Sequence, residues 1–465
     1  MTTSFHSVHE AFAATARLTP HAPFLSVPSR PGRAWLPDGA EYAYGGIAER
    51  VRALSLRYAA AGYGRGHRIA LLLENRPVFF EHYLALNALG CGIVPINPDY
   101  RHDEMAYQMS HSRADLAVAV PERVEALRAV AAEREKPLPV LDASALHAPF
   151  PAPVARAGDW VDGLEAECSL MYTSGTTGRP KACILTNRYY LEAGRWYQGL
   201  GGLAAIRPGQ DRVYNPLPLY HMNAQAVTAT MVMLTGNCMI VPERFSPSRW
   251  WEEIAETRAT VIHYLGVVPP LLLGQPHVAS ERAHNVRFGL GAGVEPQLHA
   301  AFEDRFGFPL VEIWGMTETG RIFAVTEEPR LIDTRAFGRP VGGLEARIVD
   351  ADDNELPRGT DGELVVRWGG PEGPRHGFFA GYLDNGPATT DAWRNGWFHT
   401  GDTVRQDDSG MLFFVDRSKN MIRRSGENIA AAEVEAVLQS APWVAQVAVL
   451  ACPDETRESE VLACV

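Results

Sequence analysis

The chain has 465 residues, of which 46% are hydrophobic and 21% are charged, and its formal net charge is -12. An apolar fraction at the globular average excludes disorder as the main state, and a chain of this length is expected to divide into more than one domain. The acidic balance argues against a nucleic-acid or anionic-membrane partner, because either would require a clustered basic face. Any anionic ligand must therefore be held locally, by a few placed donors.

The cysteines and the N-terminus indicate a protein of the reducing cytoplasm. Six cysteines are scattered without a repeated spacing, which favours reduced thiols over a metal site. The first residues lack a basic segment followed by an apolar run, so we predict neither a signal peptide nor a transit peptide. The longest apolar stretch, 226–241, is broken by polar residues and is predicted to be a buried helix that leads into a strand, with no transmembrane segment.

From residue 42 onward the sequence alternates between the periods of helices and strands. One helix face is marked by Ile47, Val51, Leu54 and Tyr58, and glycines from residue 62 end that helix. A strand at 68–73, a helix through residues 83 and 89 and a strand at 92–95 follow. This βαβαβ order returns between residues 213 and 314, which predicts an α/β fold with strands buried on both faces.

The pattern changes after about residue 335, where short β-rich runs replace the alternation. These runs lie at 345–349, 363–367 and 412–415, and turn formers such as Asp361-Gly362 separate them. We expect a smaller β subdomain over about 335–418.

A new unit begins near residue 419. Its pattern predicts a helix over 431–438, a strand over 444–450 and a second strand over 461–465. This segment is close to the size of about 40 residues below which a domain needs staples to fold alone, and it stops inside an apolar strand. We therefore expect that the remainder of a small α+β domain is absent from the chain.

The segment from Tyr172 to Lys181 is the strongest candidate for a ligand site. It holds hydroxyls, glycines and backbone amides that suit a polyphosphate, at Thr173, Ser174, Gly175, Thr176, Thr177 and Gly178. It is not a Walker A loop, because Pro180 precedes the lysine and Lys181 leads into a strand. A surface loop without function is the alternative, although such a loop needs far fewer donors.

Two further segments carry ligand-type side chains. At 312–320 a strand runs into a glycine turn, where Trp314 can form a wall for a flat base and Glu318 can hold a magnesium ion. At 396–402, Asp402 is suited to accept both hydroxyls of a ribose, and Arg417 can add donors. Taken alone, a tryptophan on a strand is usually core, and an aspartate in a turn is common.

Together these segments resemble the acyl-adenylate-forming enzymes of the AMP-binding superfamily, and within it the acyl-CoA synthetases. The resemblance covers essentially the whole chain, and its motifs occur in family order at 173–181, 216–221, 314–318, 398–402 and 416–419. The nearest branch contains the crotonobetaine/carnitine-CoA ligases, judged from residues 220–225 and 414–428.

The resemblance implies a fold of two packed α/β sheet subdomains and a small β-barrel-like subdomain over residues 1–418. The small C-terminal domain would follow over 419–465, with a hinge at Lys419. It implies a catalytic set of Lys181, His221, Thr317 and Glu318, in which Thr317 touches the α-phosphate and Glu318 positions magnesium.

The resemblance also implies which residues bind the nucleotide and CoA. Trp314 would stack on adenine, and Gly291-Ala292-Gly293 corresponds to the family's Gly-Gly-Ala turn with two small residues exchanged. The implied ATP-binding residues are Thr173, Ser174, Gly175, Thr176, Thr177, Gly178, Gly291, Ala292, Gly293, Glu312, Trp314, Gly315, Met316, Asp402 and Arg417. The implied CoA-binding residues are Ser425, Gly426 and Glu427.

The activity implied is that of an ATP- and Mg²⁺-dependent acid-CoA ligase, which makes an acyl-AMP and transfers the acyl group to CoA. The alternatives are an adenylating enzyme that loads a carrier protein and a non-catalytic acyl or nucleotide binder. The expected partners are a small carboxylic acid, ATP and CoA, with a possible homodimer. The walls of the acyl pocket are expected at 220–228, 263–269, 289–293 and 315–316. The lysine expected to assist adenylation would lie beyond residue 465, so we expect the chain to adenylate slowly.

Overall fold

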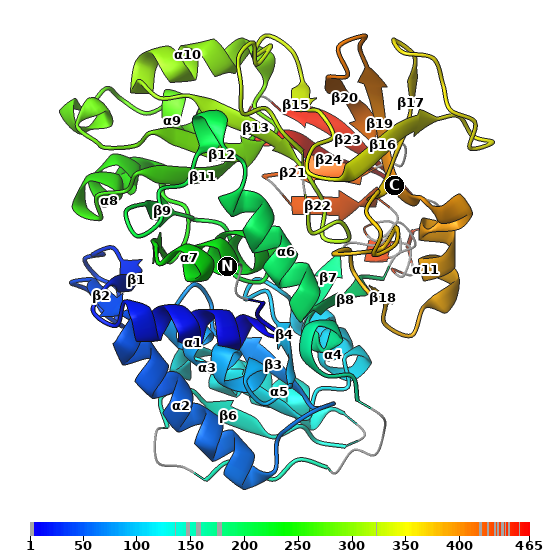
Figure 1. Cartoon of the computed structure of the whole chain (residues 1–465). Coiled ribbons are helices and arrows are strands. Elements are labelled where there is room, and N and C mark those ends of the chain that lie inside the picture. Colours follow the sequence, from blue (N-terminus) through cyan, green and yellow to red (C-terminus); the bar gives the residue numbers. More distant parts are fainter. Residues whose placement is uncertain are drawn as a thin grey trace.

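The computed structural model describes residues 4–134, 136–145, 149–154, 160–173, 179–321, 323–417, 421–425, 427–431, 434, 437–438, 441, 443–444, 447–454 and 456–465. Four sheets lie within these residues: two large sheets of eight and seven strands, an antiparallel sheet of five strands and a C-terminal sheet of four (Figure 1). The mixed α/β fold predicted from the sequence is confirmed.

The eight-stranded sheet is parallel through its centre and has an antiparallel strand at each edge. In spatial order its strands are β14 (Phe323–Ala324), β13 (Leu310–Trp314), β12 (Phe288–Ala292), β11 (Val261–Leu265), β9 (Arg212–Tyr214), β10 (Cys238–Ile240), β1 (Pro23–Val27) and β2 (Ala40–Ala43). Since β9 to β13 run parallel, their carboxyl ends meet at one edge, where open α/β sheets bind their ligands.

The seven-stranded sheet is parallel over β7, β4, β3, β5 and β6, and antiparallel where β7, β8 and β18 pair. Its strands in spatial order are β18 (Gly381–Tyr382), β8 (Lys181–Thr186), β7 (Glu167–Thr173), β4 (Gly92–Pro95), β3 (Arg68–Leu72), β5 (Leu116–Ala119) and β6 (Val140–Asp142). The predicted strands at 68–73 and 92–95 are confirmed.

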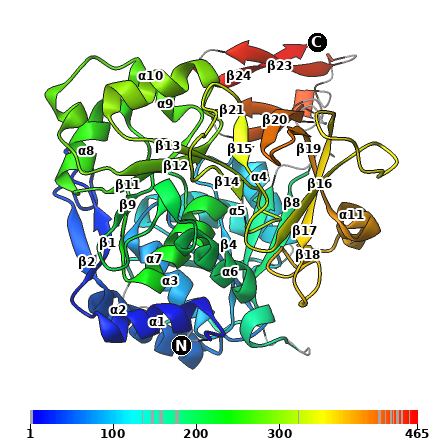
Figure 2. The same ribbon diagram turned by 45° about the horizontal axis from the view of Figure 1, so that its top comes forward.

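Helices cover both faces of the two large sheets, and a single apolar cluster joins the sheets through the helices between them (Figures 1 and 2). The α-helices are α1 (Val8–Leu18), α2 (Tyr44–Ala61), α3 (Pro77–Asn87), α4 (His102–His111), α5 (Val124–Ala132), α6 (Asn187–Gln198), α7 (Ala229–Thr235), α8 (Trp250–Glu256), α9 (Val268–Leu273), α10 (Pro296–Phe306) and α11 (Gly386–Ala392). The short 3₁₀ helices are η1 (Pro121–Arg123), η2 (Gly163–Glu165), η3 (Gly202–Ala204), η5 (Pro247–Arg249), η6 (Ala279–Arg282) and η7 (Arg394–Gly396), and η4 (Asn223–Thr228) is π-helical.

The helix predicted from Ile47, Val51, Leu54 and Tyr58 is confirmed as α2, with all four side chains buried and Gly62 in the left-handed conformation at its C-terminal end. The apolar stretch 226–241 is likewise a buried helical segment followed by a strand, because α7 leads into β10. No helix in the described part of the chain is long and apolar enough to cross a membrane.

The five-stranded antiparallel sheet lies in the region where the sequence predicts β-rich structure. Its strands in spatial order are β15 (Ala336–Gly338), β20 (Leu412–Arg417), β19 (Phe398–Gln406), β17 (Asp361–Trp368) and β16 (Leu344–Val349). The prediction that Asp361-Gly362 forms a turn is wrong, since both residues pair with β19 inside β17. A Cβ at position 362 would lie 2.6 Å from the carbonyl oxygen of Val349, so close packing explains this glycine.

The C-terminal strands form the last sheet, at the top of the view in Figure 2. In spatial order they are β22 (Glu427–Ala430), β21 (Met421–Arg424), β24 (Glu458–Cys464) and β23 (Ala448–Asp454). The two predicted strands thus exist, displaced by a few residues along the chain. Of the helix predicted over 431–438, residues 432, 433, 435 and 436 lie outside the described residues, so this prediction is not tested in full.

Candidate active site

Glu318, in the turn that follows β13, is the centre of the candidate site. Its side chain is 5% exposed, and its Oε1 accepts a hydrogen bond of 2.8 Å from the hydroxyl of Tyr382 on β18. The Lys181 ammonium at the start of β8 lies 4.9 Å from the centre of the Tyr382 ring. Three segments that are distant in sequence therefore bring a carboxylate, a phenol and a cation together.

The electrostatics of Glu318 reflect this enclosure. Burial raises the pKa of Glu318, and the hydrogen bond from Tyr382 and the charge of Lys181 lower it in part. Burial and the neighbouring Glu318 carboxylate also raise the pKa of the Cys183 thiol on β8. A buried carboxylate that is costly to ionise is stabilised by any cation brought beside it.

The turn that carries Glu318 is fixed by its neighbours. The Tyr189 hydroxyl on α6 donates to the Thr317 carbonyl oxygen at 2.8 Å, and the Phe379 amide donates to the Glu318 carbonyl oxygen at 2.9 Å. Gly320 has φ +64°, and a Cβ there would lie 2.6 Å from the Tyr189 ring. Only glycine fits this turn without strain.

A cavity of about 510 Å³ lies behind this turn. Residues 372–380, with Phe379 among them, form most of its wall, and Arg188 and Glu165 contribute to the rest. These last two side chains form an ion pair, and the wall also contains Glu372 and Arg375. The hydrogen bond from the Phe379 amide connects this wall to the Glu318 turn.

Trp314 and Asp402 form a buried pair at the end of β13. The Trp314 indole nitrogen donates to Asp402 Oδ2 at 2.8 Å, and the two side chains are 7% and 5% exposed. The Trp314 ring also stacks on Phe323, with ring centres 5.5 Å apart. Asp402 is the strand neighbour of Arg417 across β19 and β20, so these two positions lie side by side.

Glu312 organises the turn at 291–293 from within the protein. Its Oε2 accepts from the Gly293 amide at 2.9 Å, and its Oε1 accepts from the Tyr264 hydroxyl at 2.6 Å. Burial raises the pKa of Glu312, and these two hydrogen bonds lower it in part. Gly291 and Glu312 are strand neighbours, and Gly293 is exposed, with φ +85°. Glu312 therefore holds the 291–293 turn in place through the hydrogen bond that it accepts from the Gly293 amide.

The loop predicted to hold phosphate joins β7 to β8. Thr173 and Lys181 face each other as the last pair of this hairpin. Beside them, the Tyr107 hydroxyl on α4 donates to the Pro180 carbonyl oxygen at 3.1 Å, and the Arg179 guanidinium lies over the Tyr107 ring. The residues between, Ser174, Gly175, Thr176, Thr177 and Gly178, lie outside the described residues.

His221 meets the C-terminal part of the chain. Its Nε2 lies 3.3 Å from Oε1 of Glu427 on β22, and both side chains are about half exposed. Burial acts to raise the pKa of Glu427, but the contacts with His221 and Tyr220 outweigh it, so that this pKa is lowered. Ser425 is exposed and has a left-handed backbone. Lys419 and Gly426 lie outside the described residues.

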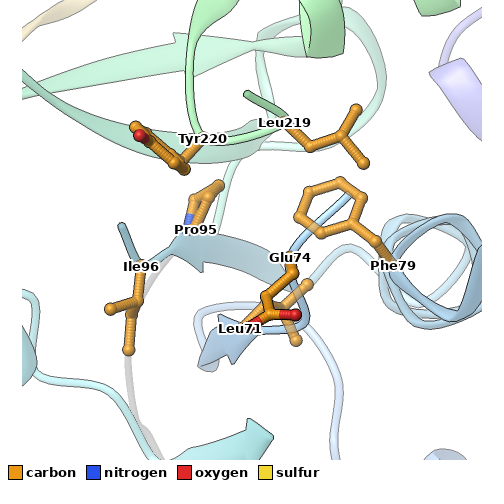
Figure 3. Close-up of a pocket in the computed structure, with 7 residues that line it drawn as sticks. All are labelled: Leu71, Glu74, Phe79, Pro95, Ile96, Leu219 and Tyr220. Atoms are coloured by element: carbon orange, nitrogen blue, oxygen red, sulfur yellow. The ribbon is translucent and has the colours of Figure 1, made fainter. Parts of the chain in front are cut away.

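The segment 216–221, which ends at His221, is anchored by Asn75. The Asn75 amide donates to the Leu217 carbonyl oxygen at 3.1 Å, and its oxygen accepts from the Leu219 amide at 2.9 Å. Figure 3 shows Leu219 and Tyr220 above Leu71, Pro95 and Ile96. The void that these residues line has a volume of about 10 Å³. A void of about one water in size indicates that this segment is closely packed against β3 and β4.

The structure thus gathers most of the predicted site residues and leaves one group apart. Glu318, Tyr382 and Lys181 form one group by direct contact, Trp314 and Asp402 form a second, and Glu312 with the 291–293 turn forms a third. Gly315, Met316 and Thr317 lie on the turn between Trp314 and Glu318, and Arg417 is the strand neighbour of Asp402. His221, Ser425 and Glu427 lie at the contact with the C-terminal sheet. Sequence reasoning missed the anchoring residues Asn75, Tyr189, Tyr264 and Tyr382, which carry no motif.

Comparisons with known proteins identify the family of this chain. The AMP-binding enzyme family matches residues 12–383. The chain is similar to a sulfoacetate–CoA ligase of Cupriavidus necator, with 31% identity over 99% of this chain and 88% of that protein. It is also similar to a crotonobetaine/carnitine–CoA ligase of Citrobacter koseri, with 30% identity over 91% of this chain and 83% of that protein.

Solved structures show the same fold. The o-succinylbenzoate CoA synthetase MenE of Bacillus subtilis, bound to a product analogue, aligns with a TM-score of 0.81 at 24% identity, over 97% of this chain and 87% of that chain. ATP-bound MatB of Rhodopseudomonas palustris aligns with a TM-score of 0.73 at 22% identity, over 98% and 88%.

Proposed function

The chain belongs to the AMP-binding enzyme family, and from this premise we infer that it is an ATP-dependent acid-CoA ligase. The reaction has two halves. A carboxylate oxygen attacks the α-phosphorus of ATP and pyrophosphate leaves, which gives an acyl-AMP. The sulfur of CoA then attacks the acyl carbon and AMP leaves, which gives a thioester.

The observation that carries this function is the convergence of separate motifs on one edge of the eight-stranded sheet. Glu318, Tyr382 and Lys181 are joined by contacts of 2.8 and 4.9 Å, and Trp314 and Asp402 by a hydrogen bond of 2.8 Å. A non-catalytic binder would have no need for a buried carboxylate and a cation beside the nucleotide site. We therefore favour catalysis over simple binding.

The first half-reaction joins two anions, so the site has to offset their repulsion. We propose that Lys181 and the backbone amides of the 173–178 loop hold the phosphate groups of ATP. The Thr317 hydroxyl would contact the α-phosphate, since Tyr189 fixes the Thr317 backbone. These groups contribute by position and charge, and no covalent enzyme intermediate is required.

Glu318 is the proposed magnesium ligand. Its buried carboxylate is a hard oxygen donor, and the described residues contain no cluster of three or more His, Cys, Asp or Glu side chains that would form an all-protein cage. A single carboxylate suits magnesium, which keeps water and phosphate oxygens as its other ligands. Bound there, the ion would neutralise charge on the phosphates, and Tyr382 would hold Glu318 in the orientation that this requires.

The nucleoside part of ATP would lie between β13 and the 291–293 turn. We propose that Asp402 accepts the ribose hydroxyls, that Arg417 adds a donor, and that Trp314 contributes an aromatic wall for adenine. Gly315, Met316 and the exposed backbone of Gly293 would complete this slot. Glu312 acts on the slot indirectly, by holding the Gly293 amide.

CoA is the proposed acyl acceptor. His221 borders the proposed acyl pocket and is joined to Glu427, so the C-terminal strands reach the place where the thiol has to arrive. We propose that Ser425, Gly426 and Glu427 border the pantetheine path, that a hinge lies at Lys419 and that the domain boundary lies near residue 418. The acids named in the relatives, sulfoacetate and crotonobetaine or carnitine, are small, and we propose a small carboxylic acid here.

Pyrophosphate exchange tests this function directly. The chain is incubated with ATP, labelled pyrophosphate, magnesium and each member of a panel of small carboxylic acids. Acid-dependent incorporation of label into ATP is expected with at least one acid, and addition of CoA should yield AMP and an acyl-CoA. Acid-independent hydrolysis of ATP to ADP would contradict the proposal.

A further inference from the structure

A second group of polar side chains is buried around the helical segment that follows His221. Its members come from α6, η4, α7, β11 and the end of β9, and each is 0% exposed: Tyr197, Asn215, Gln225, Thr228, Thr230 and His263. So many polar groups in the core of the eight-stranded sheet require hydrogen-bond partners, because burial without them is costly.

Part of this cluster is internally satisfied. The Tyr197 hydroxyl lies 2.9 Å from His263 Nε2, and the Thr228 hydroxyl lies 3.3 Å from the same nitrogen. Asn215 donates to the Thr228 hydroxyl at 2.9 Å. These contacts fix one edge of the His263 ring and hold Thr228 against β9.

The remainder of the cluster is unsatisfied. Among the residues that the structure describes, neither polar atom of the Gln225 carboxamide finds a hydrogen-bond partner, and the same holds for His263 Nδ1 and the Thr230 hydroxyl. A carboxamide has two N–H donors and an oxygen that can accept two hydrogen bonds, so Gln225 alone leaves up to four hydrogen bonds unmade. Buried polar groups without hydrogen-bond partners reduce the stability of the fold, and a bound ligand can supply the missing hydrogen bonds.

The cluster adjoins the proposed acyl pocket. The backbone N–H of Gln225 donates to the backbone carbonyl oxygen of His221 at 3.2 Å, which places Gln225 one turn beyond His221. Gln225 and Thr228 both lie in η4, three positions apart. The π-helical geometry of η4, which is frequent at functional sites, occurs over this same stretch.

The cluster carries no formal charge. Burial lowers the pKa of His263 to about 3, so the imidazole is neutral at physiological pH. The other members are amides, hydroxyls and a phenol whose pKa burial raises. The two charged groups that act on Tyr197, Asp211 and Arg287, form an ion pair of 2.7 Å and offset each other. A neutral, hydrogen-bonding ligand group therefore fits this cluster better than an ion or an alkyl chain.

We propose that Gln225 and His263 determine substrate specificity, by binding an uncharged hydroxyl or carboxamide group on the tail of the acid. The inference rests on the proposed function, because it locates the acid next to His221. The substrate class is then a short hydroxy- or carbamoyl-substituted carboxylic acid. A plain alkyl acid of the same size would leave the buried amide and imidazole unpaired and would be rejected.

The test compares pairs of acids that have the same shape and differ in polarity. The pairs are 3-hydroxybutanoate and 3-methylbutanoate, 4-hydroxybutanoate and pentanoate, and succinamate and 4-methylpentanoate. For at least one pair, kcat/KM of the unaltered chain is expected to be about 100-fold higher for the polar acid. Gln225→Leu should reduce that ratio at least tenfold, mainly by lowering kcat/KM for the polar member.

Gln108→Leu is the matched control, because Gln108 is a buried glutamine on α4, outside the cluster. It should leave the ratio of polar to alkyl acid unchanged. Equal kcat/KM within every pair, or an unchanged ratio in Gln225→Leu, would overturn the inference, and the first result does not depend on the folding of any variant. Acid-dependent pyrophosphate release with any member supports the proposed function whatever the ratio, whereas no release with any member counts against both.

Discussion

Tyr382 donates a hydrogen bond of 2.8 Å to Glu318, and this contact joins β18 of one large sheet to the turn after β13 of the other. The same phenol ring lies next to the Lys181 ammonium. Tyr382 thus links the proposed magnesium ligand to the phosphate loop, and its loss should affect both.

Glu318→Gln should leave the fold intact and weaken magnesium-dependent turnover at least tenfold, which corresponds to about 1.4 kcal/mol of barrier. The amide keeps the shape of the carboxylate and removes its charge. The measurement is the rate of pyrophosphate exchange over a range of magnesium concentrations. Unchanged turnover at saturating magnesium would remove Glu318 from the metal site.

Tyr382→Phe should move the acidic limb of the pH-rate profile to higher pH. Burial raises the pKa of Glu318 and the Tyr382 hydrogen bond lowers it, so removal of the hydroxyl raises this pKa further. Glu318 is then protonated, and the site inactivated, at a higher pH than in the unaltered chain. Tyr42→Phe, on the edge strand β2, is the control and should leave the profile in place. A shift to lower pH would refute the role assigned to Tyr382.

The raised pKa of Glu318 also predicts how stability depends on pH. The Glu318 carboxyl binds a proton more tightly in the folded state than in the unfolded chain. Protonation of Glu318 therefore contributes to the free energy of unfolding, fully below the pKa of the unfolded state, and this contribution is lost as the pH rises through the raised pKa of the folded state. Glu318→Gln should remove this loss. The measurement is the free energy of unfolding of the unaltered chain and of Glu318→Gln, from urea titrations across that pH range. The same pH dependence in both proteins would contradict the prediction.

Asp402→Ala should mainly raise the KM for ATP, because it deletes a ribose contact and leaves the reacting groups in place. It also removes the acceptor of the Trp314 indole N–H, which adds a local stability cost of about 1–3 kcal/mol. Asp361→Ala on β17 of the same sheet is an exposed control that should leave the KM unchanged. An unchanged KM in Asp402→Ala would argue against the ribose assignment.

Gly320→Ala should destabilise the fold by more than about 2 kcal/mol. The left-handed φ of +64° costs about 1–2 kcal/mol for alanine, and the Cβ would also press on the Tyr189 ring at 2.6 Å. Gly359→Ala has a similar φ of +83° and no atom within 4 Å of its Cβ, so it should cost only the backbone part. Equal losses in the two variants, measured by urea unfolding, would mean that the contact with Tyr189 is unimportant.

The sequence predicts the elements of this fold well where the periodicity is long and unbroken. The α2 face and the strands at β3 and β4 follow directly from the apolar pattern, and Lys181, Glu318 and Asp402 follow from the motifs. The Asp361-Gly362 turn fails because a glycine signal has two physical causes, a turn or a close approach. Only the packing of Gly362 against Val349 distinguishes them.

The anchoring residues could not be predicted, because their partners are distant in sequence. Tyr382 lies 64 residues from Glu318, and Asn75 lies 142 residues from Leu217. A lone tyrosine or asparagine carries no local pattern, so only the pairing of β18 with β8 and the packing of 216–221 against β3 identify these roles. The acyl-pocket walls expected at 220–228 and 263–269 include Gln225 and His263, but the contacts that bring Tyr197 and Asn215 to this region could not be predicted, for the same reason.

Acyl-AMP formation followed by thioester formation can be observed by following both products of a single turnover. Stoichiometric amounts of the chain are mixed with ATP, magnesium and the acid panel, and mass spectrometry follows the nucleotide and the acid before and after CoA is added. We expect an acyl-AMP to form first and then to be converted to AMP and an acyl-CoA. Formation of ADP or an acyl phosphate, or an acyl-CoA that forms without any adenylate, would contradict it.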